Sequence, residues 1–158
     1  MNVSKVELSL QQLEVLHNDP FYKAYKGSFS GVLRWSQLDE LWLQVVKNKE
    51  SNWFVYAVGE VPPEKPVVID EVEHFIQEVD QLLRREHDED YCGIVYANNI
   101  EEPTFIKIYD PSNLGTACGS SGTPPLPGWV LSKIKPVDLP SAFPQPNNRK
   151  RWWESIFR

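Results

Sequence analysis

The residues best suited to chemistry lie in one glycine- and proline-rich segment at positions 110–128, DPSNLGTACGSSGTPPLPG. Its centre holds a cysteine and two serines bracketed by glycines: Gly115, Cys118, Gly119, Ser120, Ser121 and Gly122. A thiol in such a loop becomes nucleophilic when backbone dipoles or a nearby cation lower its pKa. Glycines also let successive backbone N–H groups approach an anion. The segment therefore predicts a thiol-dependent enzyme or a redox sensor that uses Cys118 or, through its glycines, a site for a phosphate-bearing ligand.

This loop matches none of the catalytic motifs that it partly resembles. A phosphate-binding P-loop ends in Gly-Lys-Ser/Thr, and no lysine occurs between Lys107 and Lys133. Neither Ser120 nor Ser121 lies in the G-x-S-x-G pattern of a nucleophile elbow, so both remain candidates for donating hydrogen bonds only. The structural alternative, which we favour, is that Cys118 fills a small pocket while its neighbours turn the chain.

Asp110 is a further candidate, because it ends an apolar run where site carboxylates often occur. It also precedes Pro111, and Asp-Pro is a common turn start, which is the interpretation we favour. The three histidines have no second metal ligand at a suitable spacing. We therefore expect no metal and no cofactor.

The C-terminal segment 147–158, NNRKRWWESIFR, combines a net charge of +3 with four large apolar side chains, while the other 146 residues carry −9. Aromatic residues and arginine dominate protein interfaces. The candidate partner-binding residues are Arg149, Lys150, Arg151, Trp152, Trp153 and Phe157. Two alternatives remain open: the tail docks on the chain's own acidic helix at 70–87, or it binds weakly to a membrane surface.

Composition limits the function classes. With 158 residues the chain suits one domain, and its net charge of −6 argues against nucleic-acid binding. No apolar run has the ~20 residues of a membrane span. The first twenty residues lack the apolar core of a secretory signal, so we expect a cytoplasmic protein with reduced cysteines.

Hydrophobic periodicity predicts the elements that position these residues. Ser9 and Gln12 form a capping box before a short helix. Two longer amphipathic helices follow, one capped by Ser36 and one starting near Asp70. Strands are expected at 53–58, 91–97, 104–109 and 128–134, the middle two forming a hairpin.

These elements predict an α+β fold: a mostly antiparallel sheet of about four strands covered by two long helices and a short N-terminal helix. The strand at 53–58 is expected in the sheet interior, with a possible βαβ crossover to the next. Residues 1–135 form the domain, and 136–158 form a proline-rich strap and tail. Because no catalytic constellation emerges, the favoured function is a small accessory protein that binds another protein or a second copy of itself.

Overall fold

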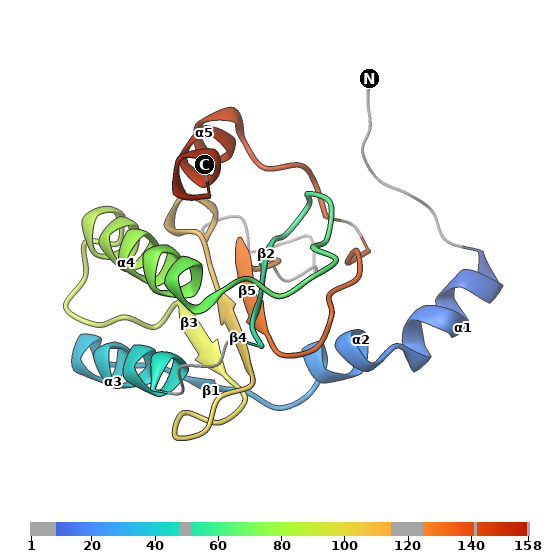
Figure 1. The fold of residues 1–158 in the computed structure, drawn as a ribbon, viewed down its shortest axis with the longest axis horizontal. Helices are drawn as coiled ribbons and strands as arrows, with labels where there is room; N and C mark the ends of the chain where they lie inside the picture. Colours follow the sequence, from blue (N-terminus) through green and yellow to red (C-terminus); the bar gives the residue numbers. More distant parts are fainter. Residues whose placement is uncertain (1–8, 48–51, 115–124, 141, 158) are drawn as a thin grey trace.

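The chain forms one antiparallel sheet with helices on both of its faces (Figure 1). The computed structural model describes residues 9–47, 52–114, 125–140 and 142–157. The helices are α1 (Leu10–Asn18), α2 (Pro20–Tyr25), α3 (Trp35–Val46), α4 (Ile69–Glu86), the 3-10 turn η1 (Pro111–Asn113) and α5 (Asn147–Ile156). The strands are β1 (Ser30–Gly31), β2 (Phe54–Ala57), β3 (Val95–Ala97), β4 (Phe105–Ile108) and β5 (Trp129–Ser132).

The strands lie in the order β1-β3-β4-β5-β2, and every neighbouring pair is antiparallel. This confirms the predicted α+β class and the β3–β4 hairpin. The fifth strand, β1, was not predicted because its two residues are too few to show an alternating pattern. None of the described helices is long and apolar enough to span a bilayer.

One face of the sheet packs against α3, α4 and α5 (Figure 1). The apolar stripes of α3 and α4 are buried there, as their periodicity predicted. Strands β2, β3, β4 and β5 contribute alternate side chains, among them Val55, Ile106 and Leu131. Burying a large aliphatic side chain stabilises the fold by about 1.5–3 kcal/mol, so this layer dominates the stability.

The opposite face is covered by α2 and by an extended segment between β5 and α5, which we call the strap (residues 136–140 and 142–146). Phe21 of α2 and Leu139 of the strap pack on Tyr56, Phe105 and Val130, which are the side chains that alternation turns to this side. The strap then continues to α5, so the chain passes from one face to the other. The strap and tail thus pack on the same sheet as the rest of the chain.

Two predicted positions in the sheet are wrong. Strand β2 lies at an edge, although Val55, Tyr56 and Ala57 are buried, because helices and strap cover both of its faces. Its outer side is partly protected by the backbone of Val67, whose N–H donates to the Trp53 carbonyl. The expected βαβ crossover is also wrong, since β4 and β5 separate β2 from β3 and the two run antiparallel.

The helix starts follow local hydrogen-bond chemistry. The Ser9–Gln12 capping box of α1 is confirmed, with bonds of 2.8 and 3.1 Å. Helix α3 begins at Trp35 rather than after Ser36, because the Gln37 side chain accepts the backbone N–H groups just before the helix. Helix α4 likewise begins one residue before Asp70, which places that carboxylate in the first turn, where the helix dipole favours it.

Candidate functional site

The candidate site lies on the strap-covered face of the sheet, around Lys107 of β4. Alternation along β4 sends Ile106 and Ile108 into the core below α3 and α4, and turns Phe105 and Lys107 the other way. In the sheet register, Tyr96 of β3 lies directly opposite Lys107. A lysine thus occupies a position in the middle of the sheet, between aromatic neighbours.

The Lys107 ammonium group is held by rings instead of by a carboxylate. Its Nζ lies 4.1 Å from the ring centroid of Tyr25 and 4.0 Å from that of Phe29. Among the described residues no carboxylate forms an ion pair with it. Burial lowers the pKa of Lys107 to about 8, because the charged form loses hydration without gaining a counterion.

Tyr25, whose ring contacts this amine, belongs to a group of interacting phenols. Five of the six tyrosines interact electrostatically within one group: Tyr22, Tyr25, Tyr56, Tyr96 and Tyr109. Burial, reinforced by the neighbouring phenols, raises the pKa of Tyr25 and Tyr109. At neutral pH these hydroxyls are therefore protonated and able to donate hydrogen bonds to an anion.

Lys107 and Tyr109 line two adjoining cavities. The smaller, of about 300 Å³, is bounded by Phe29, Gly93, Ile94, Tyr96, Leu114 and Pro125. The larger, of about 1050 Å³, is an open cleft, and we call it the strap cleft. Its walls are the end of α2, the segment from β4 through η1, residues 125–128, and strap residues 140 and 142–146. Together they are large enough for a small metabolite.

The strap is fastened over this cleft by Gln145. Its Nε2 donates to the carbonyl oxygens of Val58, at 2.9 Å, and Gly128, at 3.0 Å, so it bridges the ends of β2 and β5. Gly59 makes the close approach possible: its φ is +96°, and a Cβ there would lie 1.9 Å from the Phe143 carbonyl oxygen. One wall of the cleft is thus fixed by backbone geometry.

The strap cleft carries a positive excess in an acidic protein. The described residues of its lining include Lys26 and Lys107 but a single carboxylate, Asp110. That carboxylate is already used, because Arg149 donates to both of its oxygens, at 2.8 and 2.9 Å. Asp110 is thus already paired, and Lys26 and Lys107 are the cations among the described lining residues, although the whole chain carries −6.

Arg149 ties three separate elements together beside the cleft. From α5 it reaches Asp110 at the end of β4 and Glu86 at the end of α4, the shortest bond to Glu86 being 2.6 Å. Burial alone would raise the pKa of Asp110, but the hydrogen bonds from Arg149 and Ser112 hold it below its usual value. The bond from Arg149 likewise lowers the pKa of Glu86.

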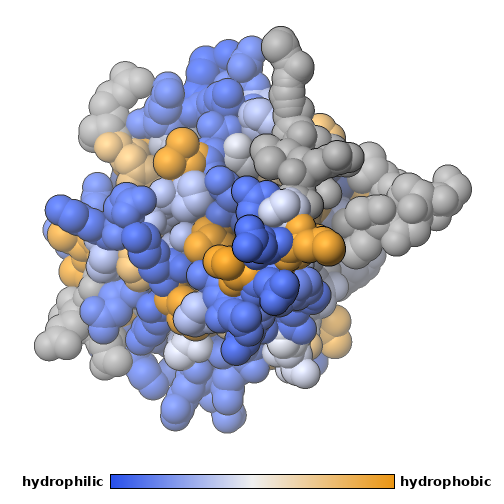
Figure 2. Space-filling view, turned by 90° about the vertical axis from the view of Figure 1, so that its right-hand side faces the viewer, coloured by the Kyte–Doolittle hydropathy of each residue, from blue (hydrophilic) through white to orange (hydrophobic). Residues whose placement is uncertain are grey.

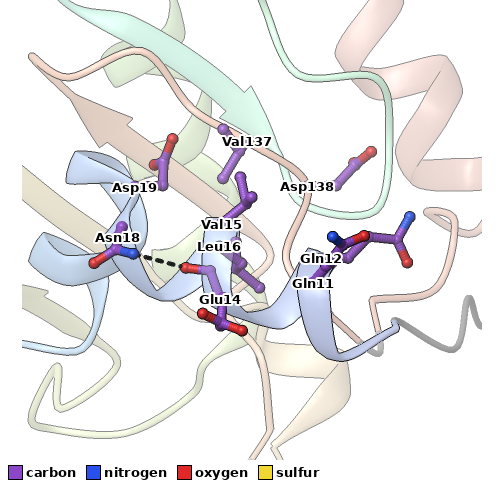
Figure 3. A pocket seen from close by; sticks show the side chains of 9 residues that line it. All are labelled: Gln11, Gln12, Glu14, Val15, Leu16, Asn18, Asp19, Val137 and Asp138. Atoms are coloured by element: carbon purple, nitrogen blue, oxygen red, sulfur yellow. Dashed lines mark hydrogen bonds between the residues drawn. The ribbon is translucent and has the colours of Figure 1, made fainter.

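A second concavity has the opposite charge. Between α1 and strap residues 137–138 lies a groove of about 840 Å³ whose charged members are Glu14, Asp19 and Asp138 (Figure 3). Figure 3 shows Val137 of the strap above the apolar side chains of α1, Val15 and Leu16. The view from this side of the molecule shows hydrophobic residues among a mainly hydrophilic surface (Figure 2). An anion would be repelled here, so charge favours the strap cleft as the anion site.

The candidate residues of the glycine-rich loop lie outside the described residues, except for Asp110. Gly115, Cys118, Gly119, Ser120, Ser121 and Gly122 all do, so their proposed roles stay predictions. The residues that flank them, Leu114 and Pro125, line the small cavity with Lys107. Asp110 starts the expected turn, since its Oδ1 accepts from the N–H and hydroxyl of Ser112.

The tail residues are placed by α5. Arg149 is buried in the ion-pair cluster, and Trp152, Trp153 and Phe157 are half-buried against Phe75 of α4. The tail therefore packs on the acidic helix of its own chain, which was one of the open alternatives. Lys150 is half-exposed and Arg151 exposed, and their binding of a partner stays a prediction.

Other chemistry is limited in the part of the chain that the structure describes. Cys92 is fully buried, and burial raises the pKa of its thiol. No group of three or more potential metal ligands occurs among the described residues. The chain matches no protein-family model, no curated protein and no solved structure. The site must therefore be interpreted from its own geometry.

Sequence reasoning missed Lys107 as a functional residue. Its signal is a single charged side chain inside the apolar run TFIKIY, a pattern that also fits a solvent-facing position of a strand. The difference is made by Tyr25 and Phe29, which come from another part of the chain and cover it. The glycine-rich loop contains no lysine, but Lys107 of the preceding strand β4 lines a cavity together with Leu114 and Pro125, which flank the loop.

Proposed function

We propose that this protein binds a small anionic ligand, carrying a phosphate or carboxylate group, in the strap cleft. The observation that carries the proposal is the half-buried Lys107 ammonium without a carboxylate partner among the described residues. Charges withdrawn from water are normally paired, and an anion in the cleft would supply the missing partner. The protonated hydroxyls of Tyr25 and Tyr109 add donors of the right kind.

This proposal develops the phosphate-ligand hypothesis of the sequence analysis. It moves the positive charge from the loop to Lys107 and keeps Gly115, Gly119 and Gly122 as predicted backbone contributors. The thiol-dependent enzyme at Cys118 stays an alternative prediction. It requires Cys118→Ser to abolish an activity that Cys92→Ser leaves intact.

Thermal melting with inorganic phosphate, pyrophosphate and citrate tests the anion site, with sodium chloride at equal ionic strength as the control. A ligand at a hundred times its dissociation constant stabilises the folded state by about 2.7 kcal/mol, which raises the melting temperature by several degrees. We expect Lys107→Gln to abolish this increase. Lys133→Gln is the matched control, because Lys133 also lies over a ring, that of Trp53, but is exposed. Equal protection of both variants would contradict the proposal.

Protein binding, the function favoured by the sequence, is the second candidate, and α1 supports it better than the tail does. No residue of α1 is buried, and its Leu10 and Val15 are 81% and 72% exposed. The groove beside it joins apolar side chains to three carboxylates. The partner expected from this chemistry is a basic amphipathic helix.

A synthetic helix with leucine on one face and lysine on the other tests this second function by fluorescence anisotropy. Val15→Asp removes the apolar contact but adds negative charge, so we expect weaker binding if the groove is a docking site. Tighter or unchanged binding would show that charge attraction alone is at work. Deleting residues 147–158 is unsuitable as a test, because it removes the buried Arg149 and Ile156.

A further inference from the structure

The position of the Lys107 amine suits chemistry as well as binding. The Lys107 side chain lines both cavities from the middle of the sheet, so a ligand in the strap cleft would contact this side chain. The rings of Tyr25 and Phe29 hold its Nζ atom in place without accepting its proton. A lysine fixed among rings and short of a counterion is the arrangement in which the amine is a nucleophile.

Protonation supports this role. With a pKa of about 8, half of the Lys107 side chains are neutral at pH 8. An ordinary lysine, with a pKa near 10.4, is only about 0.4% neutral at that pH. Because the neutral amine is the form that attacks carbon, Lys107 has roughly a hundredfold larger reactive fraction than a solvated lysine.

We propose that Lys107 forms a reversible imine with an aldehyde or ketone group of the anionic ligand bound in the strap cleft. This inference rests on the proposed function and names the ligand class, a carbonyl compound that carries a phosphate or carboxylate. The lysine then has two roles. Its charge attracts the ligand, and its neutral form reacts with it.

The reaction balances without any oxidant or reductant. The nitrogen lone pair of Lys107 attacks the carbonyl carbon and forms a C–N bond, while the carbonyl electron pair moves to oxygen. Transfer of one proton from nitrogen to that oxygen gives the carbinolamine. The nitrogen then loses its second proton as the C–O bond breaks, and the oxygen leaves as water, which gives the C=N bond. The protonated phenols of Tyr25 and Tyr109, which line the same cleft, are the available hydrogen-bond donors to the carbonyl oxygen.

Pyridoxal 5′-phosphate, which joins an aldehyde to a phosphate, is a suitable probe for the native full-length protein. Borohydride reduces its imines to stable amines, and peptide mapping by mass spectrometry then gives the labelled lysines. At equimolar probe we expect Lys107 to be labelled at least tenfold more than exposed Lys133. Labelling of Lys107 no faster than that of Lys133 would overturn the inference.

Two further probes distinguish imine formation at Lys107 from anion binding in the strap cleft. Pyridoxine 5′-phosphate has the phosphate without the aldehyde and should compete, whereas pyridoxal has the aldehyde alone and should label Lys107 more slowly. If Lys107 is labelled equally fast by pyridoxal and inorganic phosphate does not compete, the imine stands and the proposed anion function fails. If phosphate protects against melting but no adduct forms on Lys107, the anion function stands and the imine fails.

A charge-conserving variant gives an independent test. Lys107→Arg keeps the cation but has no amine that forms an imine, so the borohydride-stable adduct in this peptide should disappear. Far-UV circular dichroism checks that the variant is folded. Total labelling of the variant equal to that of the native protein would overturn the inference, because the label would then lie elsewhere.

Discussion

Replacing Arg149 by methionine removes the positive charge at the centre of the buried ion-pair cluster. The unbranched methionine side chain still fills most of the space of the aliphatic part of the arginine. The Arg149 side chain is 5% exposed and donates four hydrogen bonds, two to Asp110 and two to Glu86. Without it, the Asp110 carboxylate, 9% exposed, stays buried and has Ser112 as its one donor among the described residues. We therefore expect a strongly destabilised but folded protein.

The magnitude follows from the exposure of the two carboxylates. Removing one partner of a buried ion pair costs about 3–5 kcal/mol, most of it from the uncompensated charge left behind. Glu86 is 33% exposed, so water can hydrate it, and most of the loss should come from Asp110. Glu86→Gln should consequently cost less than about 1 kcal/mol, as do exposed pairs.

Urea unfolding measures these free energies, with Arg151→Met as the matched control. Arg151 lies on the exposed side of the same helix, so its replacement should change the free energy of unfolding by no more than about 0.5 kcal/mol. Adding Asp110→Asn to Arg149→Met should recover part of the loss, because the buried charge is gone. A loss below about 1 kcal/mol for Arg149→Met would refute the assignment of this cluster as a major stabilising interaction.

The cluster also sets the response to acid. The pKa values of Asp110 and Glu86 are lowered in the folded state, so their contribution is fully present above their unfolded values of about 3.9 and 4.3. It is lost as the pH falls through the lower folded values. The native protein should thus lose stability more steeply below pH 4 than Arg149→Met does, in urea unfolding from pH 2 to 7.

Three smaller predictions concern other parts of the fold. Gly59→Ala should cost about 1–3 kcal/mol in urea unfolding, because its φ of +96° and the Phe143 carbonyl leave no room for a Cβ; an unchanged midpoint would contradict the strap geometry. Native Cys92 should react with iodoacetamide only as fast as the protein unfolds, and peptide mapping of the same samples shows whether Cys118 reacts earlier. Ser9→Ala should reduce the helical circular dichroism but leave the main melting transition in place, since α1 buries no residue; a lower melting temperature would show that α1 is coupled to the core.

The sequence predicts the elements whose signals are local. The apolar stripes of α3 and α4 repeat over several turns, so their helical period is enough to predict both helices. The strands β3 and β4 are joined by a short polar loop, and this spacing is enough to predict the hairpin. Helix α2 was missed because Asp19 ends α1 and also caps the next helix, with Pro20 at its first position. Asp19 and Pro20 therefore end one helix and begin the next, and the sequence pattern predicted only the helix end.

The candidate site depends on contacts that no local pattern contains. Lys107 becomes unusual only because Tyr25 and Phe29, about eighty residues earlier, cover it. The opposite charges of the tail and the acidic helix left open whether the tail docks on its own chain or on a partner. That question is decided by Asp110 and Glu86, which meet at one buried arginine although they belong to separate elements.

The ion-pair cluster and the strap cleft are coupled through Asp110. It is the single carboxylate among the described residues that line the cleft, and Arg149 pairs with it from the side of α5. When Arg149 is replaced, that negative charge is released next to the positions that attract an anion. Arg149→Met should therefore weaken phosphate binding although it leaves Lys107 in place, and Arg149→Met with Asp110→Asn should restore it. Unchanged phosphate affinity in the single variant would mean that Asp110 does not control the charge of the cleft.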